Sequence, residues 1–263
     1  MKIMFLGQAG FLIEGNGTRF IIDPYLSNFV VDSGIGNAKL FSREFPAPIQ
    51  TDKLCDIDTA FITHDHADHC DPTTLIPLLM NNPKCKVICP YTVFNVLIKL
   101  GISHKRLCVP PVGMGQKEGS LSYSAIPSAH YLLDLNPETG ESPYFGYVIE
   151  FEGVVIYHSG DTVLYDGLLR TLRHAASHID IACLPVNGRD EKREALGIIG
   201  NLQPEEAAKL AHSLGANFLI PMHNDLFKIN RLDPEIVNNH ITKHFTGQKV
   251  KWLQPGDVFH YPR

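Results

Sequence analysis

The order of predicted strands and helices places this chain in the α/β class, as a four-layer αββα sandwich of two sheets with helices outside. Strand-like runs dominate the first half, and strands alternate with helices in the second half. No linker or low-complexity tract separates the halves, so we expect residues 1–263 to form a single domain. Of the 263 residues, 44% are hydrophobic and 19% are charged, which is enough apolar material for one large core.

Hydrophobic runs separated by turn residues predict the elements of the first half. Three strands within residues 2–24 form a meander with glycine-containing turns. Residues 25–50 carry many Gly, Pro and polar residues and little periodicity, which predicts a long loop of the lid or binding-loop type. Five elements are expected after it: a strand over 57–62, a helix starting at Asp71 and Pro72, a strand over 86–90, a helix over 92–100 and a strand over 107–109.

The second half alternates in the same way, with two loops that lack periodicity. A strand over 121–126 precedes a loop over 131–143, and a charged loop covers 187–203. The expected helices begin near Leu164, at Pro204 and at Pro234. The remaining expected strands cover 144–151, 154–158, 179–184, 217–221, 250–253 and 258–261.

The densest chemical signal is the segment from Thr63 to His69, which contains the pattern H-x-H-x-D-H. Imidazole nitrogens and carboxylate oxygens suit divalent metals such as zinc, manganese and iron. In an extended segment, residues two apart point the same way, so His64 and His66 can hold one metal. Asp68 and His69 follow after the chain turns and can serve a second metal. A polar loop that is histidine-rich by chance is disfavoured, because the strand–loop–helix context agrees with the motif.

Four more residues with ligand-type side chains stand at the ends of predicted strands. They are Asp23, His130, Asp161 and His223. Strand ends at one edge of a sheet converge in space, so these residues can meet the H-x-H-x-D-H loop. Each one alone is weak evidence, since a histidine after a strand is more often an ordinary surface or hydrogen-bonded residue. Their order along the chain relative to the motif, with Asp23 before it and the other three after it, gives the set its weight.

With these motifs in this order, the chain resembles the metallo-β-lactamase superfamily over nearly its whole length. The resemblance implies that Asp23 supports the metal loop without binding metal. It implies two divalent metal ions, zinc or manganese with iron also compatible. The implied ligands are His64, His66 and His130 on one metal, Asp68, His69 and His223 on the other, and Asp161 bridging both.

Within that superfamily, several segments look like those of the ascorbate-phosphate lactonase group. They are the 63–69 motif, Tyr157 to Thr162, Pro221 to Asp225 and Asp233 to Ile236. This resemblance implies a lactonase that opens a small, phosphorylated sugar-acid lactone with a hydroxide activated by two metals. Asp68 is the expected catalytic residue, because it can orient the nucleophile while binding metal.

The expected substrate is a small anionic molecule. Two divalent cations outweigh the carboxylates of Asp68 and Asp161, so the site attracts anions. Arg189 follows a strand and is the main candidate for binding a phosphate or carboxylate of the substrate. The alternative is that Arg189 is a solvated charge in a charged loop. Tyr131 and Asn224 adjoin ligand residues and are weaker candidates for substrate contacts.

Composition and charge argue against several classes of partner and location. The net charge of −5 argues against nucleic acid and membrane surfaces as partners. No apolar run reaches membrane-spanning length, and no signal peptide is visible, so a cytoplasmic protein is expected. The cysteines are predicted to be buried thiols in a reducing compartment. They are Cys55, Cys70, Cys85, Cys89, Cys108 and Cys183.

Other functions fit parts of the pattern. A phosphodiesterase acting on a small phosphodiester or nucleic acid is the main alternative, although no basic arm is visible. A redox di-iron protein is disfavoured because its family pattern has glutamate where this chain has His66. A non-catalytic metal-binding protein is disfavoured by the complete ligand set, and a β-lactamase by the bridging Asp161 and the missing export signal. The sequence leaves the oligomeric state open, a homo-oligomer included.

Overall fold

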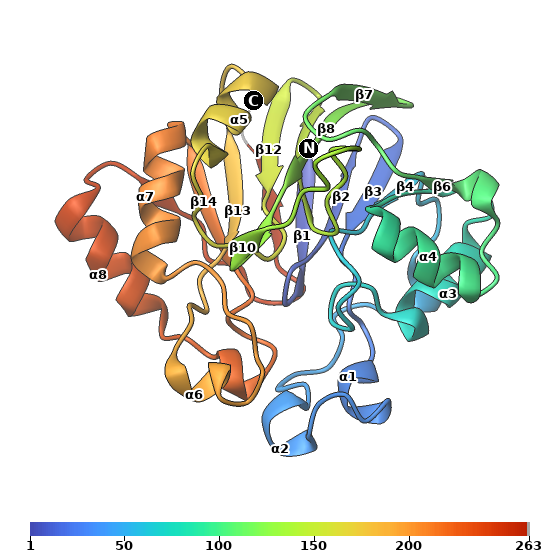
Figure 1. Ribbon diagram of the computed structural model, residues 1–263, viewed down its shortest axis with the longest axis horizontal. Helices are drawn as coiled ribbons and strands as arrows, with labels where there is room; N and C mark the ends of the chain where they lie inside the picture. Colours follow the sequence, from blue (N-terminus) through green and yellow to red (C-terminus); the bar gives the residue numbers. More distant parts are fainter. Residues whose placement is uncertain (262–263) are drawn as a thin grey trace. The chain divides into compact units, whose positions relative to one another are not determined.

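The computed structural model describes residues 1–261, and for Thr242 only its place in a helix. The chain forms two compact units, each built around a seven-stranded mixed sheet (Figure 1). Unit 1 contains residues 1–110, 225–229 and those from 253 onward, and unit 2 contains residues 111–224 and 230–252. The predicted α/β class is confirmed, and the single domain over 1–263 stays a prediction.

The sheet of unit 1 joins an antiparallel half to a parallel half. Its strand order is β16-β1-β2-β3-β4-β5-β6, with antiparallel pairs from β16 to β3 and parallel pairs from β3 to β6. The predicted meander within residues 2–24 is confirmed as β1 to β3. The strand bounds are β1 Lys2–Gly7, β2 Gly10–Gly15, β3 Thr18–Ile22, β4 Thr59–Phe61, β5 Lys86–Ile88, β6 Leu107–Cys108 and β16 Val258–His260.

Two helices of unit 1 pack on the parallel strands and build its main apolar cluster. Leu75 and Leu78 of α3 and Val93 of α4 share this cluster with Ala60 and Val87 of the sheet. As predicted, α3 starts after Asp71, whose side chain accepts a hydrogen bond from the Thr73 amide. The helices are α1 Phe29–Asp32, α2 Ala38–Phe41, η1 Thr51–Lys53, α3 Pro72–Asn81, α4 Tyr91–Lys99 and η2 His104–Arg106.

The sheet of unit 2 repeats this plan. Its order is β15-β14-β13-β12-β11-β8-β7, antiparallel from β7 to β12 and parallel from β12 to β15, and a separate hairpin pairs β9 with β10. The strand bounds are β7 Gly115–Glu118, β8 Leu121–Pro127, β9 Ala129–His130, β10 Leu132–Leu133, β11 Phe145–Phe151, β12 Val154–His158, β13 Ile181–Pro185, β14 Phe218–Met222 and β15 Lys249–Val250.

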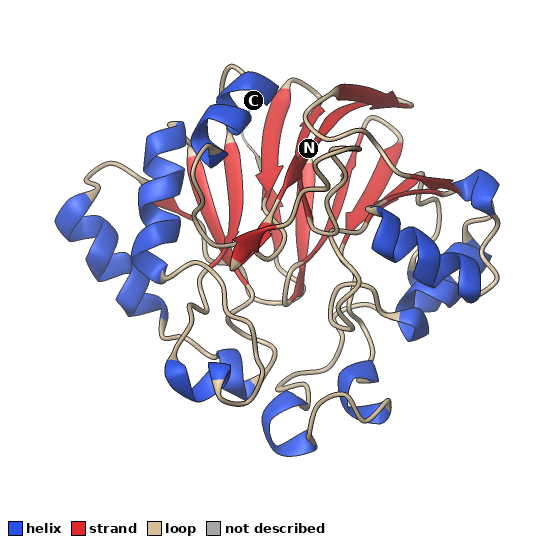
Figure 2. Ribbon diagram, viewed as in Figure 1, coloured by secondary structure: helices blue, strands red, loops and turns tan. Residues whose placement is uncertain are grey.

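Helices α5, α7 and α8 pack into one apolar cluster with the strands of unit 2 (Figure 2). Ala207 and Ala211 of α7 lie in this cluster with Tyr157, Ala182 and Leu184 of the sheet. As predicted, α7 starts at Pro204 and is capped by Gly215 in the left-handed region, at φ 67°. The bounds are α5 Leu168–Ala175, α6 Glu191–Glu194, α7 Pro204–Leu214, η3 Lys228–Asn230 and α8 Pro234–His244.

Several local predictions need correction. The expected loops over 25–50 and 187–203 contain short helices, α1 and α2 in the first and α6 in the second. The helix expected near Leu164 begins at residue 168, after Gly167 in the left-handed region at φ 96°, and Val163 donates its amide to the distant Ala129 carbonyl instead of joining a helix. The expected loop 131–143 contains strand β10, and the polar edge strand β7 carries no apolar alternation that would have indicated it. Of the free cysteines, Cys55 and Cys108 are exposed and not buried.

The long segment over residues 25–50 is anchored to its own unit. The guanidinium of Arg43 donates to the carbonyl oxygens of Tyr25 and Ser27 at 2.9 and 3.2 Å. An antiparallel backbone bridge between Arg43 and Phe227 also connects residues 25–50 to the 225–229 segment. The lid role of residues 25–50 stays a prediction.

Among the helices of residues 1–261, none combines the length and the apolar character needed to cross a bilayer.

Candidate metal centre

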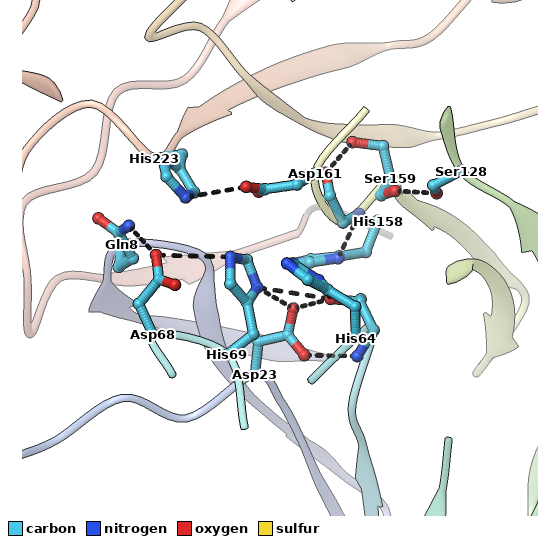
Figure 3. Close-up of polar contacts among 12 residues, drawn as sticks. Gln8, Asp23, His64, Asp68, His69, Ser128, His158, Ser159, Asp161 and His223 are labelled. Atoms are coloured by element: carbon cyan, nitrogen blue, oxygen red, sulfur yellow. Dashed lines mark hydrogen bonds and ion pairs between the residues drawn. The ribbon is translucent and has the colours of Figure 1, made fainter. Parts of the chain in front are cut away.

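Four predicted ligands of unit 1, His64, His66, Asp68 and His69, lie in the loop between β4 and α3. Figure 3 shows three of them, His64, Asp68 and His69. The chain turns as predicted, because the His66 carbonyl accepts hydrogen bonds from the amides of His69 and Cys70. A ring nitrogen of His64 lies within 4.8 Å of one on His66 and of one on His69. Oxygen Oδ2 of Asp68 lies 3.7 Å from Nε2 of His69. The loop therefore gathers three imidazoles and one carboxylate, which we call the ligand cluster of unit 1.

Asp23 orients the ring of His69. Its Oδ2 lies 2.8 Å from Nδ1 of His69, and both residues are fully buried. Thr63 holds the other side of Asp23, donating its amide to Oδ1 at 2.8 Å and its hydroxyl to Oδ2 at 2.6 Å. A carboxylate on Nδ1 favours the tautomer with the proton there, which leaves Nε2 for a metal.

Thr63 also contacts the ring of His64, with its hydroxyl oxygen 3.0 Å from Nδ1. The imidazole of His64 is 1% exposed and packs against the rings of His66 and His69, with centroids 4.6 and 4.1 Å apart. The histidines of the cluster thus limit one another's rotation. Imidazole rings gathered beside a carboxylate offer the nitrogen and oxygen donors that divalent cations bind.

In unit 2, Asp161 and His223 form a second group, which we call the ligand pair of unit 2. Oδ2 of Asp161 lies 3.2 Å from Nε2 of His223, and the two side chains are 5% and 6% exposed. Asp161 follows β12 and His223 follows β14, so the parallel strands supply both. On the other side of the His223 ring, Nδ2 of Asn230 lies 3.3 Å from Nδ1.

His130 ends strand β9 and is 8% exposed. Its ring packs edge-on against Tyr144, with centroids 5.3 Å apart. The neighbouring hydroxyl of Thr162 accepts the amide of Ala129 at 3.1 Å, so the segment after Asp161 is tied to β9. Within unit 2, the backbone therefore links the His130 strand to the Asp161 loop.

The donors of both units fit divalent cations. Each unit offers buried imidazoles and a carboxylate, partly buried at Asp68 and buried at Asp161, and these are the ligand types that zinc, manganese and iron share. Cys70, next to the motif, is 3% exposed and belongs to the apolar cluster of α3, so its side chain is used in packing. Metal number, metal identity and the assignment of seven ligands to two ions stay predictions.

Arg189, predicted to hold a substrate anion, has an ion-pair partner that sequence reasoning missed. Its Nη1 and Nη2 donate to the two carboxylate oxygens of Glu206 at 2.7 and 2.8 Å. The pair lowers the pKa of Glu206 and raises that of Arg189. The available signal was Gln203 with Glu206 three residues later, a capping box at the start of α7. The substrate role of Arg189 stays a prediction, and it would have to coexist with this pair.

The other two predicted substrate residues also have identified contacts. Tyr131, at φ 73°, donates its hydroxyl to Glu194 at 2.7 Å and accepts the Gly200 amide at 3.1 Å. It thereby joins the loop after His130 to the 187–203 loop. The carbonyl of Asn224 accepts the amide of Leu232. Their substrate contacts stay predictions.

Sequence reasoning also missed Gln8, whose amide Nε2 donates to Oδ2 of Asp68 at 2.7 Å (Figure 3). No motif includes this residue. The indirect signal was its position in a turn flanked by Gly7 and Gly10, where backbone can approach another segment closely.

Comparison with known proteins gives consistent results. The chain is 29% identical over 262 residues to a UPF0173 metal-dependent hydrolase of Thermococcus kodakarensis, covering 98% of each protein. Among solved structures, a metallo hydrolase of Ignicoccus hospitalis matches with a TM-score of 0.68 at 21% identity, covering 99% of both chains. An isothiocyanate hydrolase from Delia radicum gut bacteria matches with a TM-score of 0.74 at 17% identity over the whole of both chains.

These two structural matches show the fold and not the substrate. They confirm the predicted metallo-β-lactamase fold class. The profile described as "Beta-lactamase superfamily domain" matches residues 18–224, a range that includes both the ligand cluster of unit 1 and the ligand pair of unit 2. The chain therefore belongs to the beta-lactamase superfamily.

Proposed function

We propose that this protein is a metal-dependent hydrolase that opens a small, phosphorylated sugar-acid lactone with two divalent cations, zinc or manganese. The observation that carries the metal dependence is the ligand cluster of unit 1, whose His69 ring is oriented by Asp23 at 2.8 Å. The name of the Thermococcus relative, a metal-dependent hydrolase, supports the reaction class. The lactone comes from the resemblance of the motif segments to the lactonase group.

The side chains have separate tasks in this reaction. When bound, the cations supply Lewis acidity at the carbonyl oxygen and ionise water near neutral pH. Asp68 orients the attacking water and accepts its proton. The water oxygen bonds to the lactone carbonyl carbon, the ring C–O bond breaks, and the proton passes to the leaving alkoxide oxygen. One lactone and one water thus yield one hydroxy acid.

The ligand charges favour an anionic substrate. Asp68 and Asp161 supply fewer negative charges than two divalent cations supply positive ones, and the histidines are neutral ligands. The net charge of −5 argues against a polyanion such as nucleic acid. A phosphate group on the substrate would meet an Arg189 that is already paired with Glu206, so the cations have to supply most of the attraction.

The test compares two substrates after metal removal and reconstitution with manganese or zinc. We expect hydrolysis of ascorbate 6-phosphate and little hydrolysis of a bis-aryl phosphodiester. Faster turnover of the diester would replace the lactonase proposal with a phosphodiesterase. The His66→Ala variant should lose turnover at least about a hundredfold, whereas His104→Ala, on an exposed 3-10 helix outside the cluster, should keep it. Near-normal activity of His66→Ala would overturn the metal-dependent mechanism.

A further inference from the structure

Gln8 lies in the tight turn between β1 and β2, and nothing in the reaction so far uses it. Its side chain is fully buried, and its amide nitrogen Nε2 donates to Oδ2 of Asp68 at 2.7 Å (Figure 3). Burial of an amide costs free energy unless the amide forms hydrogen bonds. The contact with Asp68 therefore offsets part of the cost of burying the Gln8 side chain.

The backbone of this turn is held in an uncommon conformation. Gln8 has φ 58°, in the left-handed region that non-glycine residues seldom adopt. Its own amide donates to Oδ1 of Asp225 at 3.0 Å. Gln8 thus contacts two carboxylates, Asp225 through its main chain and Asp68 through its side chain. The main-chain contact with Asp225 holds the Gln8 backbone, and this orients the Gln8 side chain toward Asp68.

The neighbouring glycines let the turn approach its surroundings closely. A Cβ at Gly7 would lie 2.9 Å from the Phe45 ring, and a Cβ at Gly10 would lie 3.1 Å from the carbonyl oxygen of Asp23. The turn is therefore packed against Phe45 and against the residue that orients His69. This close packing leaves Gln8 little freedom to move away from Asp68.

We propose that Gln8 is a positioning residue that fixes the rotation of the Asp68 carboxylate for metal binding. The proposal rests on the metal-dependent function above and adds a role for a residue outside the ligand set. An amide suits this role because it orients a carboxylate without neutralising it. A Lys or Arg at the same place would compete with the cation for the negative charge of Asp68.

A carboxylate has about four lone-pair positions on its two oxygens, so one hydrogen bond from Gln8 leaves others for a metal. The contact also limits carboxylate rotation, which reduces the conformational freedom that Asp68 loses on binding a cation. An amide does not titrate in the working pH range, so the hydrogen bond persists where the enzyme works.

The test measures cobalt(II) binding to metal-free protein by calorimetry and by the d–d absorption of the bound ion. Gln8→Met keeps the size of the side chain and removes the donor, and Gln8→Asn keeps an amide donor on a shorter side chain without adding a metal ligand. Gln50→Met is the matched control, because Gln50 is exposed and makes no cap hydrogen bond. Thermal unfolding of each metal-free variant reports purely structural damage.

We expect Gln8→Met to bind cobalt about 10- to 100-fold more weakly at the site that uses Asp68, with an altered absorption band. Gln8→Asn should bind cobalt more tightly than Gln8→Met, and Gln50→Met should match the wild type. Unchanged affinity and absorption in Gln8→Met, beside a wild type that binds cobalt, would overturn the role of Gln8 alone. A wild type that binds no cobalt would overturn the proposed function, and the Gln8 inference with it.

Discussion

The two units use the same sheet plan but assemble their ligands differently. In each, antiparallel strands give way to parallel ones, at β3–β4 in unit 1 and at β12–β13 in unit 2. Candidate ligands or their supports follow strands at these switches: Asp23 after β3, the H-x-H-x-D-H motif after β4 and Asp161 after β12. Loops after parallel strands lie at one edge of a sheet, so the same plan produces polar sites twice.

The difference is in how the ligands are spread along the sequence. Unit 1 has four candidate ligands in one short loop, whereas unit 2 has the candidates His130, Asp161 and His223 at three separate strand ends. The supports differ too. Unit 1 holds His69 with a buried carboxylate at 2.8 Å, and unit 2 places an amide 3.3 Å from His223. Unit 1 is therefore expected to depend more strongly on its supporting contacts.

The largest expected effect is at Asp23 in unit 1. Asp23→Ala removes the acceptor of two Thr63 hydrogen bonds and of the His69 contact, all in a fully buried position. Leaving such donors without a partner should lower the free energy of unfolding of the metal-free protein by about 3 kcal/mol. Urea denaturation measures it, with Asp32→Ala on the short helix α1 as the control. A loss below about 1 kcal/mol would contradict the supporting role.

In unit 2, the corresponding change is Asn230→Leu. The amide of Asn230 contacts Nδ1 of His223, and Asn230 is 6% exposed. Without it, the His223 ring is less constrained, and affinity for cobalt(II) should fall about tenfold. Titration of the metal-free variant gives the value, and Asn239→Leu at an exposed position of α8 serves as a comparison. Unchanged cobalt(II) affinity of Asn230→Leu, beside a wild type that binds the ion, would contradict the supporting role of Asn230.

The smallest expected effect concerns the Arg189–Glu206 pair of unit 2. The Arg189 hydrogen bonds lower the pKa of Glu206, so the folded state favours the ionised carboxylate. The resulting stability is fully present above the unfolded pKa, about 4.3, and is lost as pH falls through the lower folded value. At 24% exposure of the Glu206 side chain, the contribution is about 1 kcal/mol.

Glu206→Gln should therefore cost about that amount at pH 7 and very little at pH 3, as measured by denaturation at both values. If Glu206→Gln lowered the free energy of unfolding equally at both pH values, the ionised Arg189–Glu206 pair would not be the source of the lost stability.

Local patterns were sufficient for many elements but not for their connections. The helix after Asp71 and the helix between Pro204 and Gly215 were predictable because caps and apolar spacing lie within a few residues. The helix start at Leu168 was not predictable, because a hydrogen bond between the distant residues Val163 and Ala129 precedes it. Strand β10 pairs with the adjacent β9 and was missed because its two residues are too few to form a strand pattern. The backbone pairing of Val163 with Ala129 has no local signature.

The same division applies to the candidate site. The sequence by itself determined the metal-binding motif, since ligand residues within one loop need only local geometry to converge. Only the tertiary structure decided that Gln8 contacts Asp68, that Asp23 holds His69, and that Glu206 pairs with Arg189. These contacts join residues far apart in the chain, and their partners are set by strand order and register. A pattern of residue types alone does not encode that information.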